Sequence, residues 1–319
     1  MRALKFADDE LKIAEVSAPQ VNNEALIRVV KSGICNTDLE IVRGYAGFSG
    51  IIGHEFVGVV EKSAARPDLI GKRVVGEINA GCGACEKCRA GDARHCPQRT
   101  VLGILGRNGA HAEFLTLPAE NLLEVPAAVD DEQAVFVEPL AAAFGITEQI
   151  AIAPQTSVAV VGDGKLGLLC AMCLALESEN VVLIGKHREK LLLAEKRGIE
   201  TVLLEDAARL NRSFDVTVEA SGSESGFATA LDLLKPRGKM ILKSTFQGRA
   251  NLEMWRVVVD EISIIGSRCG RFAPALEILA SGKINVSDLV SERFHLSDGI
   301  EAMRSAAEKG VLKVILSMD

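Results

Sequence analysis

Four cysteines stand close together in one glycine-bearing segment of the chain. Within residues 81–96 they are separated by two, two and seven residues, and they are Cys82, Cys85, Cys88 and Cys96. Thiolates at such spacings can converge on one tetrahedral zinc ion, and Gly83 and Gly91 let the backbone wrap tightly around it. A chance cluster of free thiols is the alternative, but such thiols in a polar loop are prone to oxidation. The spacing therefore predicts a structural zinc site with no position left for a substrate.

A nucleic-acid-binding zinc ribbon is a second alternative for this segment. It carries Glu86 and Asp92 among its basic residues, and it has no aromatic residue on which a base could stack. The whole chain is acidic, with 36 Lys and Arg against 43 Asp and Glu and a formal net charge of −7. Nucleic-acid partners favour a basic face, so we expect none here.

A second set of candidate metal ligands is spread over three fragments. They are the thiol of Cys35, the imidazole of His54 and the carboxylate of Glu138. Sulfur and imidazole suit zinc, and a carboxylate at an apolar helix start is costly unless it is paired or binds a metal. Three protein ligands with one open position are the pattern of a catalytic zinc. The residues alone equally allow a core thiol, a turn histidine and a helix N-terminal charge.

A glycine-rich turn follows the short apolar strand expected at residues 158–161 and precedes a helix. It has the pattern G-x-G-x-x-G, which in this context indicates a dinucleotide site. Gly162 permits the tight turn, Gly164 lets a pyrophosphate approach the backbone, and Gly167 allows the helix to pack on the strand. The positive end of the helix receives the phosphates. The expected cofactor contacts are Gly162, Gly164, Lys165, Leu166 and Gly167, and a turn without a ligand is the alternative.

The end of the next strand predicts which dinucleotide is bound. An NAD site has a carboxylate about 20 residues further on, which holds the ribose hydroxyls, but this chain has Gly185 there. Without an acid, a ribose 2′-phosphate has room, and Lys186, His187 and Arg188 supply charge-assisted donors. The sequence therefore predicts NADP in preference to NAD. The basic residues could instead form a solvated loop.

The elements that must position these residues change character along the chain. Residues 1–125 have short, β-branched strands between glycine and polar turns, which is typical of a barrel-like β domain. A helix is expected over residues 131–150, and apolar strands then alternate with helices, which predicts a parallel sheet covered on both faces. The predicted class is α/β, with a β-rich domain and a doubly wound domain. The last fifty residues could close the sheet or return to the first domain.

Composition sets outer limits on the class of protein. The chain has 319 residues, 48% of them apolar and 25% charged, which excludes a disordered chain. No targeting segment is visible at its start, and the longest apolar stretch is about half of the roughly 20 residues of a membrane span. We therefore expect a cytoplasmic protein with no membrane partner. In that compartment the eight cysteines are not expected to form disulfides.

The order of the motifs resembles that of the zinc-containing medium-chain dehydrogenases, such as alcohol, sorbitol, glucose and threonine dehydrogenases. The order is Gly-Ile-Cys-x-Thr-Asp, Gly-His-Glu, the four-cysteine segment and Glu-Pro-Leu. The resemblance covers essentially the whole chain. It implies a GroES-like catalytic domain at 1–138, a Rossmann domain at 139–267, and a segment at 268–319 that returns to the catalytic domain. It also implies about two zinc ions per subunit and a homo-oligomer, either a dimer or a tetramer.

The same resemblance implies roles for the candidate metal ligands. Cys35, His54 and Glu138 would bind the catalytic zinc, and Glu55 would be a nearby or exchanging ligand. Asp38 would orient His54 by a hydrogen bond, as residues behind metal ligands commonly do.

A proton relay is also implied. Thr37 would hydrogen-bond the reacting alcohol and pass its proton outward. Many relatives continue this relay with a histidine three residues later, where this chain has Glu40. A carboxylate can also accept a proton, so the relay could continue through Glu40 or run to water.

The expected reaction is hydride transfer between a primary or secondary alcohol, or a polyol, and NADP, with carbonyl reduction in reverse. Zinc would favour the alkoxide, and the hydride would pass to the nicotinamide ring in a cleft between the domains. One alternative is a zinc-independent NADPH reductase of activated double bonds, and another is a non-catalytic NADPH-binding protein. The sequence does not identify the substrate among polyols, sugars, amino alcohols and simple alcohols.

Overall fold

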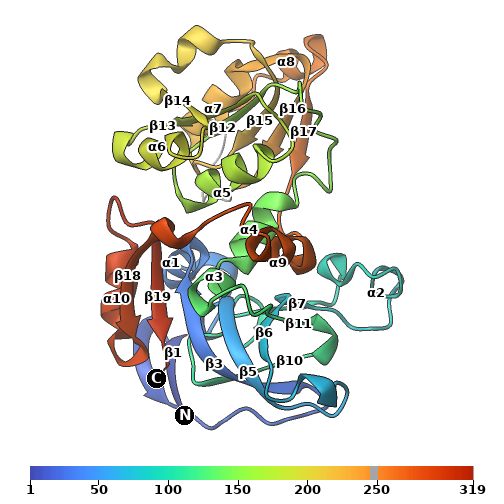
Figure 1. Cartoon of the computed structure of the whole chain (residues 1–319), viewed down its shortest axis with the longest axis vertical. Coiled ribbons are helices and arrows are strands. Elements are labelled where there is room, and N and C mark those ends of the chain that lie inside the picture. Colours follow the sequence, from blue (N-terminus) through green and yellow to red (C-terminus); the bar gives the residue numbers. More distant parts are fainter. Residues whose placement is uncertain (245–250, 319) are drawn as a thin grey trace. The chain divides into compact units, whose positions relative to one another are not determined.

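The computed structural model describes residues 1–244 and 251–318, which form two compact units. The first unit contains Met1–Glu138 and Phe272–Asp319, and the second contains Pro139–Arg271. Strands dominate the first unit, whereas strands and helices alternate in the second (Figure 1). The predicted α/β class, with a β-rich domain and a doubly wound domain, is confirmed.

The main sheet of the first unit has the strand order β11-β6-β5-β3-β19-β18, and β10 also pairs with β3. Smaller sheets have the orders β2-β1-β4 and β7-β8-β9. The strands are β1 (Arg2–Ala7), β2 (Glu10–Glu15), β3 (Ala25–Ile34), β4 (Gly50–Ile51), β5 (Glu55–Lys62), β6 (Arg73–Gly76), β7 (Asn79–Ala80), β8 (Thr100–Leu102), β9 (Gly106–Arg107), β10 (Phe114–Leu117), β11 (Leu122–Glu124), β18 (Val290–His295) and β19 (Lys313–Ser317). Apolar side chains alternate along β3 and place Ile27 and Val29 in the core.

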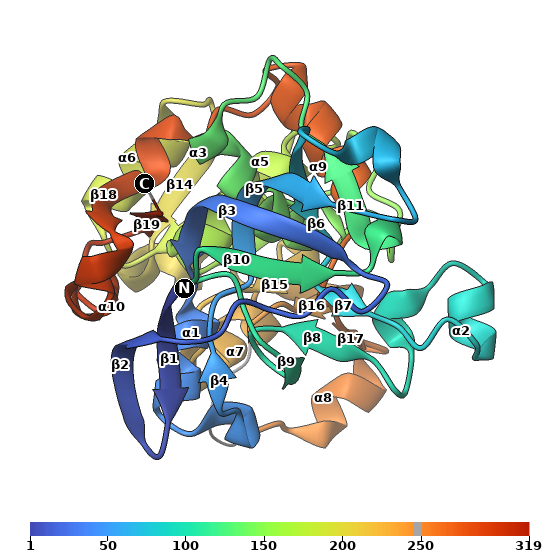
Figure 2. The same ribbon diagram turned by 90° about the horizontal axis from the view of Figure 1, so that it is seen from below.

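The helices of the first unit are short. They are α1 (Asn36–Val42), α2 (Glu86–Arg89), α3 (Asp131–Val135), α9 (Phe272–Ala280) and α10 (Gly299–Ala306), and α4 (Val137–Phe144) begins at its boundary. The four-cysteine segment carries α2 and follows β7; Figure 2 shows α2 standing out from the strands of this unit. A loop that extends in this way has little core of its own, so it needs another source of rigidity.

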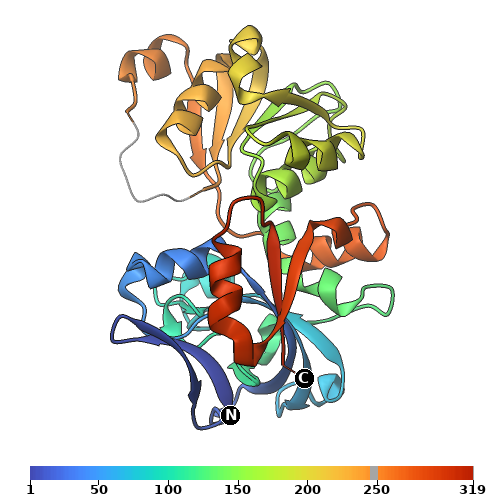
Figure 3. The ribbon, with the colours of Figure 1, turned by 90° about the vertical axis from the view of Figure 1, so that its left-hand side faces the viewer.

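The end of the chain completes the sheet of the first unit. β19 pairs antiparallel with β3, with Val314 opposite Ile34, and β18 pairs parallel with β19. Figure 3 shows α10 packed along these two strands. The main sheet is therefore built from segments at opposite ends of the sequence.

The second unit is a parallel sheet with the strand order β14-β13-β12-β15-β16-β17. Its strands are β12 (Val158–Val161), β13 (Val181–Gly185), β14 (Glu200–Leu203), β15 (Phe214–Glu219), β16 (Leu234–Leu242) and β17 (Ser263–Gly266), and its helices are α5 (Lys165–Leu174), α6 (Arg188–Glu195), α7 (Glu224–Asp232) and α8 (Met254–Val259). The order reverses direction at β12, and such switch points are where doubly wound sheets bind their ligands.

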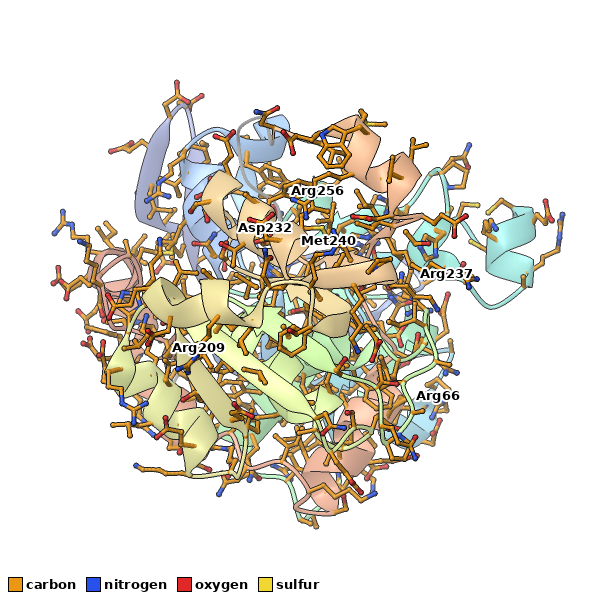
Figure 4. The ribbon with its side chains drawn as sticks, turned by 90° about the horizontal axis from the view of Figure 1, so that it is seen from above. Arg66, Arg209, Asp232, Arg237, Met240 and Arg256 are labelled. Atoms are coloured by element: carbon orange, nitrogen blue, oxygen red, sulfur yellow. The ribbon has the colours of Figure 1, made fainter. Side chains whose placement is uncertain are left out.

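Helices cover the sheet of the second unit because its strands are apolar on both faces. Ala159 and Val161 of β12 belong to a core cluster with Phe227 and Ala230 of α7. The alternate residues of β12 are also buried, and α5 contacts this strand as well. Arg256 of α8 pairs with Asp232 at the end of α7, and Figure 4 shows these two labelled side chains near each other. Among the described residues, none of the helices has the length and apolar character needed to cross a bilayer.

The prediction of one helix over residues 131–150 was wrong in the extent of that helix. The structure has α3 (Asp131–Val135), a break at Phe136, and then α4 (Val137–Phe144). Pro139 explains the break, because its ring excludes the carbonyl of the residue four positions earlier, which is Val135, the last residue of α3.

Candidate functional site

The four clustered cysteines form a compact set of sulfur ligands. The sulfur atoms of Cys82, Cys85, Cys88 and Cys96 all lie within 4.8 Å of one another, and all four are free thiols. The backbone φ angles of Gly83 and Gly91 are +71° and +75°, in the region where a side chain would be strained. This donor set and these turns fit one tetrahedral zinc ion of the structural kind.

The local backbone already favours a thiolate in this segment. Backbone N–H groups of Ala84 and Cys85 lower the pKa of Cys82 to about 6. Desolvation and the neighbouring thiols raise the pKa of Cys88 to about 11. Because zinc binds the thiolate form, metal binding here would release protons from the remaining thiols.

We expect Cys88→Ser to reduce the zinc content of the purified protein from about two ions per chain to about one. Cys173→Ala is the matched control, because Cys173 is fully buried in α5 and burial raises its thiol pKa well above the usual value, so it is unsuited to metal binding. Elemental analysis of both variants measures the difference. An unchanged zinc content in Cys88→Ser would contradict a zinc site in this segment.

A second ligand set forms where β3 and β5 meet. Ligand atoms of Cys35, His54 and Glu55 all lie within 4.8 Å of one another. The strand register explains this convergence, because Gly33 near the end of β3 is paired with Glu55 at the start of β5. A Cβ atom on Gly33 would lie 2.5 Å from Oε2 of Glu55, so only glycine leaves room for the carboxylate at this point.

Glu138, the carboxylate that the sequence pointed to, lies in the first turn of α4. In the described structure it does not join Cys35, His54 and Glu55 within 4.8 Å. Of the two candidate carboxylates, Glu55 is the one that the fold brings to the sulfur and the imidazole.

Asp38 ties the two ligand-bearing fragments together. Its side chain is fully buried in α1, and it accepts hydrogen bonds from the backbone N–H groups of Cys35 at 2.8 Å and Gly53 at 3.1 Å. Oδ1 also lies 3.4 Å from Nδ1 of His54. Burial alone would favour the neutral acid, but the facing imidazoles of His54 and His111 outweigh it and hold the pKa of Asp38 well below its usual value.

The same arrangement affects His54. Burial opposes an imidazolium ion, but the carboxylate of Asp38 and the sulfur of Cys35 outweigh it and raise the pKa of His54 well above the usual value. A raised pKa favours the protonated form of His54 when no metal ion is bound. A divalent cation bound by the imidazole would displace its proton.

His111 is a buried member of this network for which the sequence gave no signal. Its Nδ1 lies 2.8 Å from Oγ of Ser32, and its Nε2 lies 3.6 Å from Oδ2 of Asp38. Its ring packs against Gly53, where a Cβ atom would lie 2.5 Å from Nδ1. His111 follows a glycine and an alanine in an irregular segment, and nothing local distinguishes it from a core residue.

Glu55 has a second buried partner at the far end of the chain. Nζ of Lys313 in β19 contacts Oε2 of Glu55, and both side chains are fully buried. The ammonium also lies 5.3 Å from the centre of the Phe136 ring. Oε1 of Glu55 is buried with no hydrogen-bond partner in the described structure. An unsatisfied buried oxygen beside a thiol and an imidazole is a donor set that fits zinc.

The two groups expected to relay a proton lie on the first turns of α1. The Thr37 hydroxyl lies 3.8 Å from the sulfur of Cys35, so it adjoins the ligand set. Glu40 is paired with Arg43, with Oε1 and Nη1 2.7 Å apart. Its carboxylate is thus held by a cation that directly follows its own helix.

The glycine turn lies at the switch point of the parallel sheet. Gly162 has a φ of +121°, and a Cβ atom on Gly167 would lie 1.8 Å from the carbonyl oxygen of Gly162, so both positions require glycine. Gly164 precedes the first residue of α5, and a Cβ atom there would meet nothing within 4 Å. This tight turn with open space at a helix N-terminus fits the pyrophosphate of a dinucleotide.

The end of β13 does not have the free space for a ribose 2′-phosphate that its sequence suggested. Gly185 is the last residue of β13, but the adjacent space holds the side chain of Asp163 from the glycine turn. Arg188, one of the basic residues at 186–188, is already paired with an anionic partner, Glu195, on the same helix.

Two matches to known families cover most of the chain. Residues 21–127 match the alcohol dehydrogenase GroES-like domain, and residues 166–281 match the family described as zinc-binding dehydrogenase. The L-threonine 3-dehydrogenase of Shewanella frigidimarina is 30% identical, and the alignment covers 100% of both chains.

Solved structures with the same fold carry either cofactor. A putative zinc-binding dehydrogenase of Sinorhizobium meliloti bound to NADP superposes with a TM-score of 0.90 at 26% identity, covering 99% of this chain and 98% of that one. A short chain alcohol dehydrogenase of Escherichia coli CFT073 complexed with NADH has a TM-score of 0.90 at 25% identity, covering 100% of this chain and 99% of that one. The fold alone therefore does not decide between the two dinucleotides.

Proposed function

The chain belongs to the zinc-containing medium-chain dehydrogenases, and from this we propose that it transfers a hydride between an alcohol or polyol and a nicotinamide dinucleotide. Reduction of the corresponding carbonyl compound is the reverse reaction. The observation that supports this most strongly is the convergence of Cys35, His54 and Glu55, with an unsatisfied oxygen of Glu55 in the group.

The proposed catalytic metal ligands are Cys35 and His54 with one carboxylate. Glu55 is favoured as the third ligand by its position, and Glu138 is the other candidate. Bound there, zinc would supply Lewis acidity that favours the alkoxide. Asp38 would keep His54 oriented, because its carboxylate is fixed by the N–H groups of Cys35 and Gly53.

Thr37 is the proposed first acceptor of the alcohol proton, because its hydroxyl adjoins Cys35. A hydroxyl can accept one proton while donating its own, so it can pass charge outward without being ionised. Glu40 is the proposed next group, and its side chain is paired with Arg43. Water is the alternative acceptor.

The glycine turn is proposed to hold the dinucleotide through Gly162, Gly164, Lys165, Leu166 and Gly167. The sequence predicts NADP, if the space at Gly185 and the basic residues Lys186, His187 and Arg188 receive the ribose 2′-phosphate. NAD is preferred if the carboxylate of Asp163 determines cofactor binding at this point.

The segment with Cys82, Cys85, Cys88 and Cys96 is proposed to hold a structural zinc ion, which makes about two zinc ions per subunit with the catalytic one.

We also propose a homo-oligomer, either a dimer or a tetramer. Large apolar side chains of α8 support it, because Met254, Trp255, Val258 and Val259 are between 60% and 71% exposed. Exposed apolar groups that cluster in this way are typical of protein–protein interfaces.

An oxidation screen tests the proposed reaction. Simple secondary alcohols, polyols, sugars and amino alcohols would each be offered with NAD and with NADP, and zinc content would be measured on the same sample. We expect at least one class to be oxidised, with activity that follows zinc content. Activity that survives complete removal of zinc would favour a double-bond reductase instead. Cofactor binding without turnover of any alcohol or carbonyl would favour a non-catalytic protein.

A further inference from the structure

Asp163 reaches from the glycine turn to the neighbouring strand end. It stands between Gly162 and Gly164, and only 7% of its surface is exposed. Its Oδ2 atom accepts hydrogen bonds from the backbone N–H groups of Lys186 at 2.6 Å and His187 at 2.7 Å. Nδ1 of His187 lies 3.1 Å from Oδ1 and 3.0 Å from Oδ2. The carboxylate of Asp163, in the glycine turn after β12, is thus fixed at the end of β13.

This carboxylate takes the space that a side chain at position 185 would need. A Cβ atom on Gly185 would lie 2.5 Å from both Cβ and Oδ2 of Asp163. An acid at position 185 and an acid at position 163 therefore exclude each other. The glycine at the strand end makes room for the Asp163 side chain rather than for a ligand phosphate.

Several of the groups that could bind a 2′-phosphate at this point are already engaged. The N–H groups of Lys186 and His187 make short, charge-assisted hydrogen bonds to Asp163, and Arg188 is paired with Glu195. A phosphate placed here would have to displace a carboxylate and would be repelled by it. A ribose diol is a pair of donors, and an ionised carboxylate still has lone pairs to accept from it.

We propose that Asp163 is the acid that recognises the adenosine ribose hydroxyls, and that the chain therefore prefers NAD(H) to NADP(H). The acid that other dinucleotide sites carry at the strand end has, in this chain, been moved into the glycine turn. The preference is opposite to the one that Gly185 alone predicts. This inference rests on the proposed dinucleotide-binding function.

Calorimetric titration of the full chain with NADH and with NADPH tests the proposal. The wild type should bind NADH at least about tenfold more tightly than NADPH, which corresponds to about 1.4 kcal/mol. Asp163→Asn keeps the side-chain shape but removes the charge, and it should reduce or reverse this ratio by a similar factor. Asp163→Gly combined with Gly185→Asp returns the carboxylate to the strand end and should restore the preference for NADH.

Asp215→Asn is the matched control. It removes a carboxylate from the same unit, but at the amino end of the inner strand β15, where Asp215 bonds to Ser157 and Lys235. The control should leave the ratio of the two affinities unchanged. A wild type that prefers NADPH, or an Asp163→Asn protein with the wild-type ratio, overturns the role of Asp163. A folded wild type that binds neither cofactor overturns the proposed function itself.

Discussion

A protein carrying Cys35→Ser should lose about a thousandfold or more of its alcohol-oxidising turnover while it still binds the dinucleotide. The sulfur of Cys35 is the soft ligand in a set that also contains His54 and Glu55, and a serine hydroxyl is a poor replacement for a thiolate at zinc. Metal-ion catalysis contributes several kcal/mol of transition-state stabilisation, and each 1.36 kcal/mol is about tenfold in rate. The glycine turn belongs to the other unit, so the cofactor site should stay intact.

Steady-state turnover and cofactor titration on the same preparation measure this effect. Cys173→Ala provides the control, because it removes a thiol from the core of α5 rather than from a ligand set. Full turnover in Cys35→Ser would end the assignment of the catalytic metal site. Loss of cofactor binding in parallel would indicate a general disturbance of the fold instead.

Lys313→Met should destabilise the metal-free protein by about 3–5 kcal/mol. The substitution removes the cation that contacts Glu55 while keeping an apolar side chain of similar length. Both side chains of this pair are fully buried, so the variant would leave a buried carboxylate without a counter-charge. Removing one partner of such a pair is far more costly than replacing both, because the remaining charge stays desolvated.

Urea denaturation of the variant in a chelator measures the loss. Lys235→Met is the control, since it breaks the Lys235–Asp215 pair, whose side chains are 41% and 45% exposed, and exposed pairs contribute at most about 1 kcal/mol. Adding Glu55→Gln to Lys313→Met should recover much of the stability. A Lys313→Met protein no less stable than Lys235→Met would show that the buried pair contributes little.

Local patterns were sufficient to predict the fold class. Apolar strands that alternate with helices after residue 130 predicted the parallel sheet, and the glycines at 162, 164 and 167 predicted the turn at its switch point. Both features depend on neighbours in sequence. The single helix predicted over 131–150 is instead two helices that end at Phe144, and Pro139, which excludes the carbonyl of Val135, accounts for the break between them.

The candidate metal site was less accessible from sequence, because it is assembled by strand register. Gly33 pairs with Glu55 across β3 and β5, and no local pattern reveals that pairing. His111 and Lys313 join the network from distant strands and loops. Asp163 was visible inside the glycine motif, yet the motif treats its position as free, so its effect on Gly185 required the structure.

The position of β19 has a consequence for how the protein is made. This strand pairs with β3, and its Lys313 is the buried partner of Glu55, but a ribosome synthesises it only after the whole second unit. Until then the nascent chain holds an unpaired edge of β3 over Lys31–Ile34 and a Glu55 side chain without its lysine partner, and such edges are prone to association. Contacts of this long range close slowly, so completion of the first unit during vectorial synthesis must wait for the final strand.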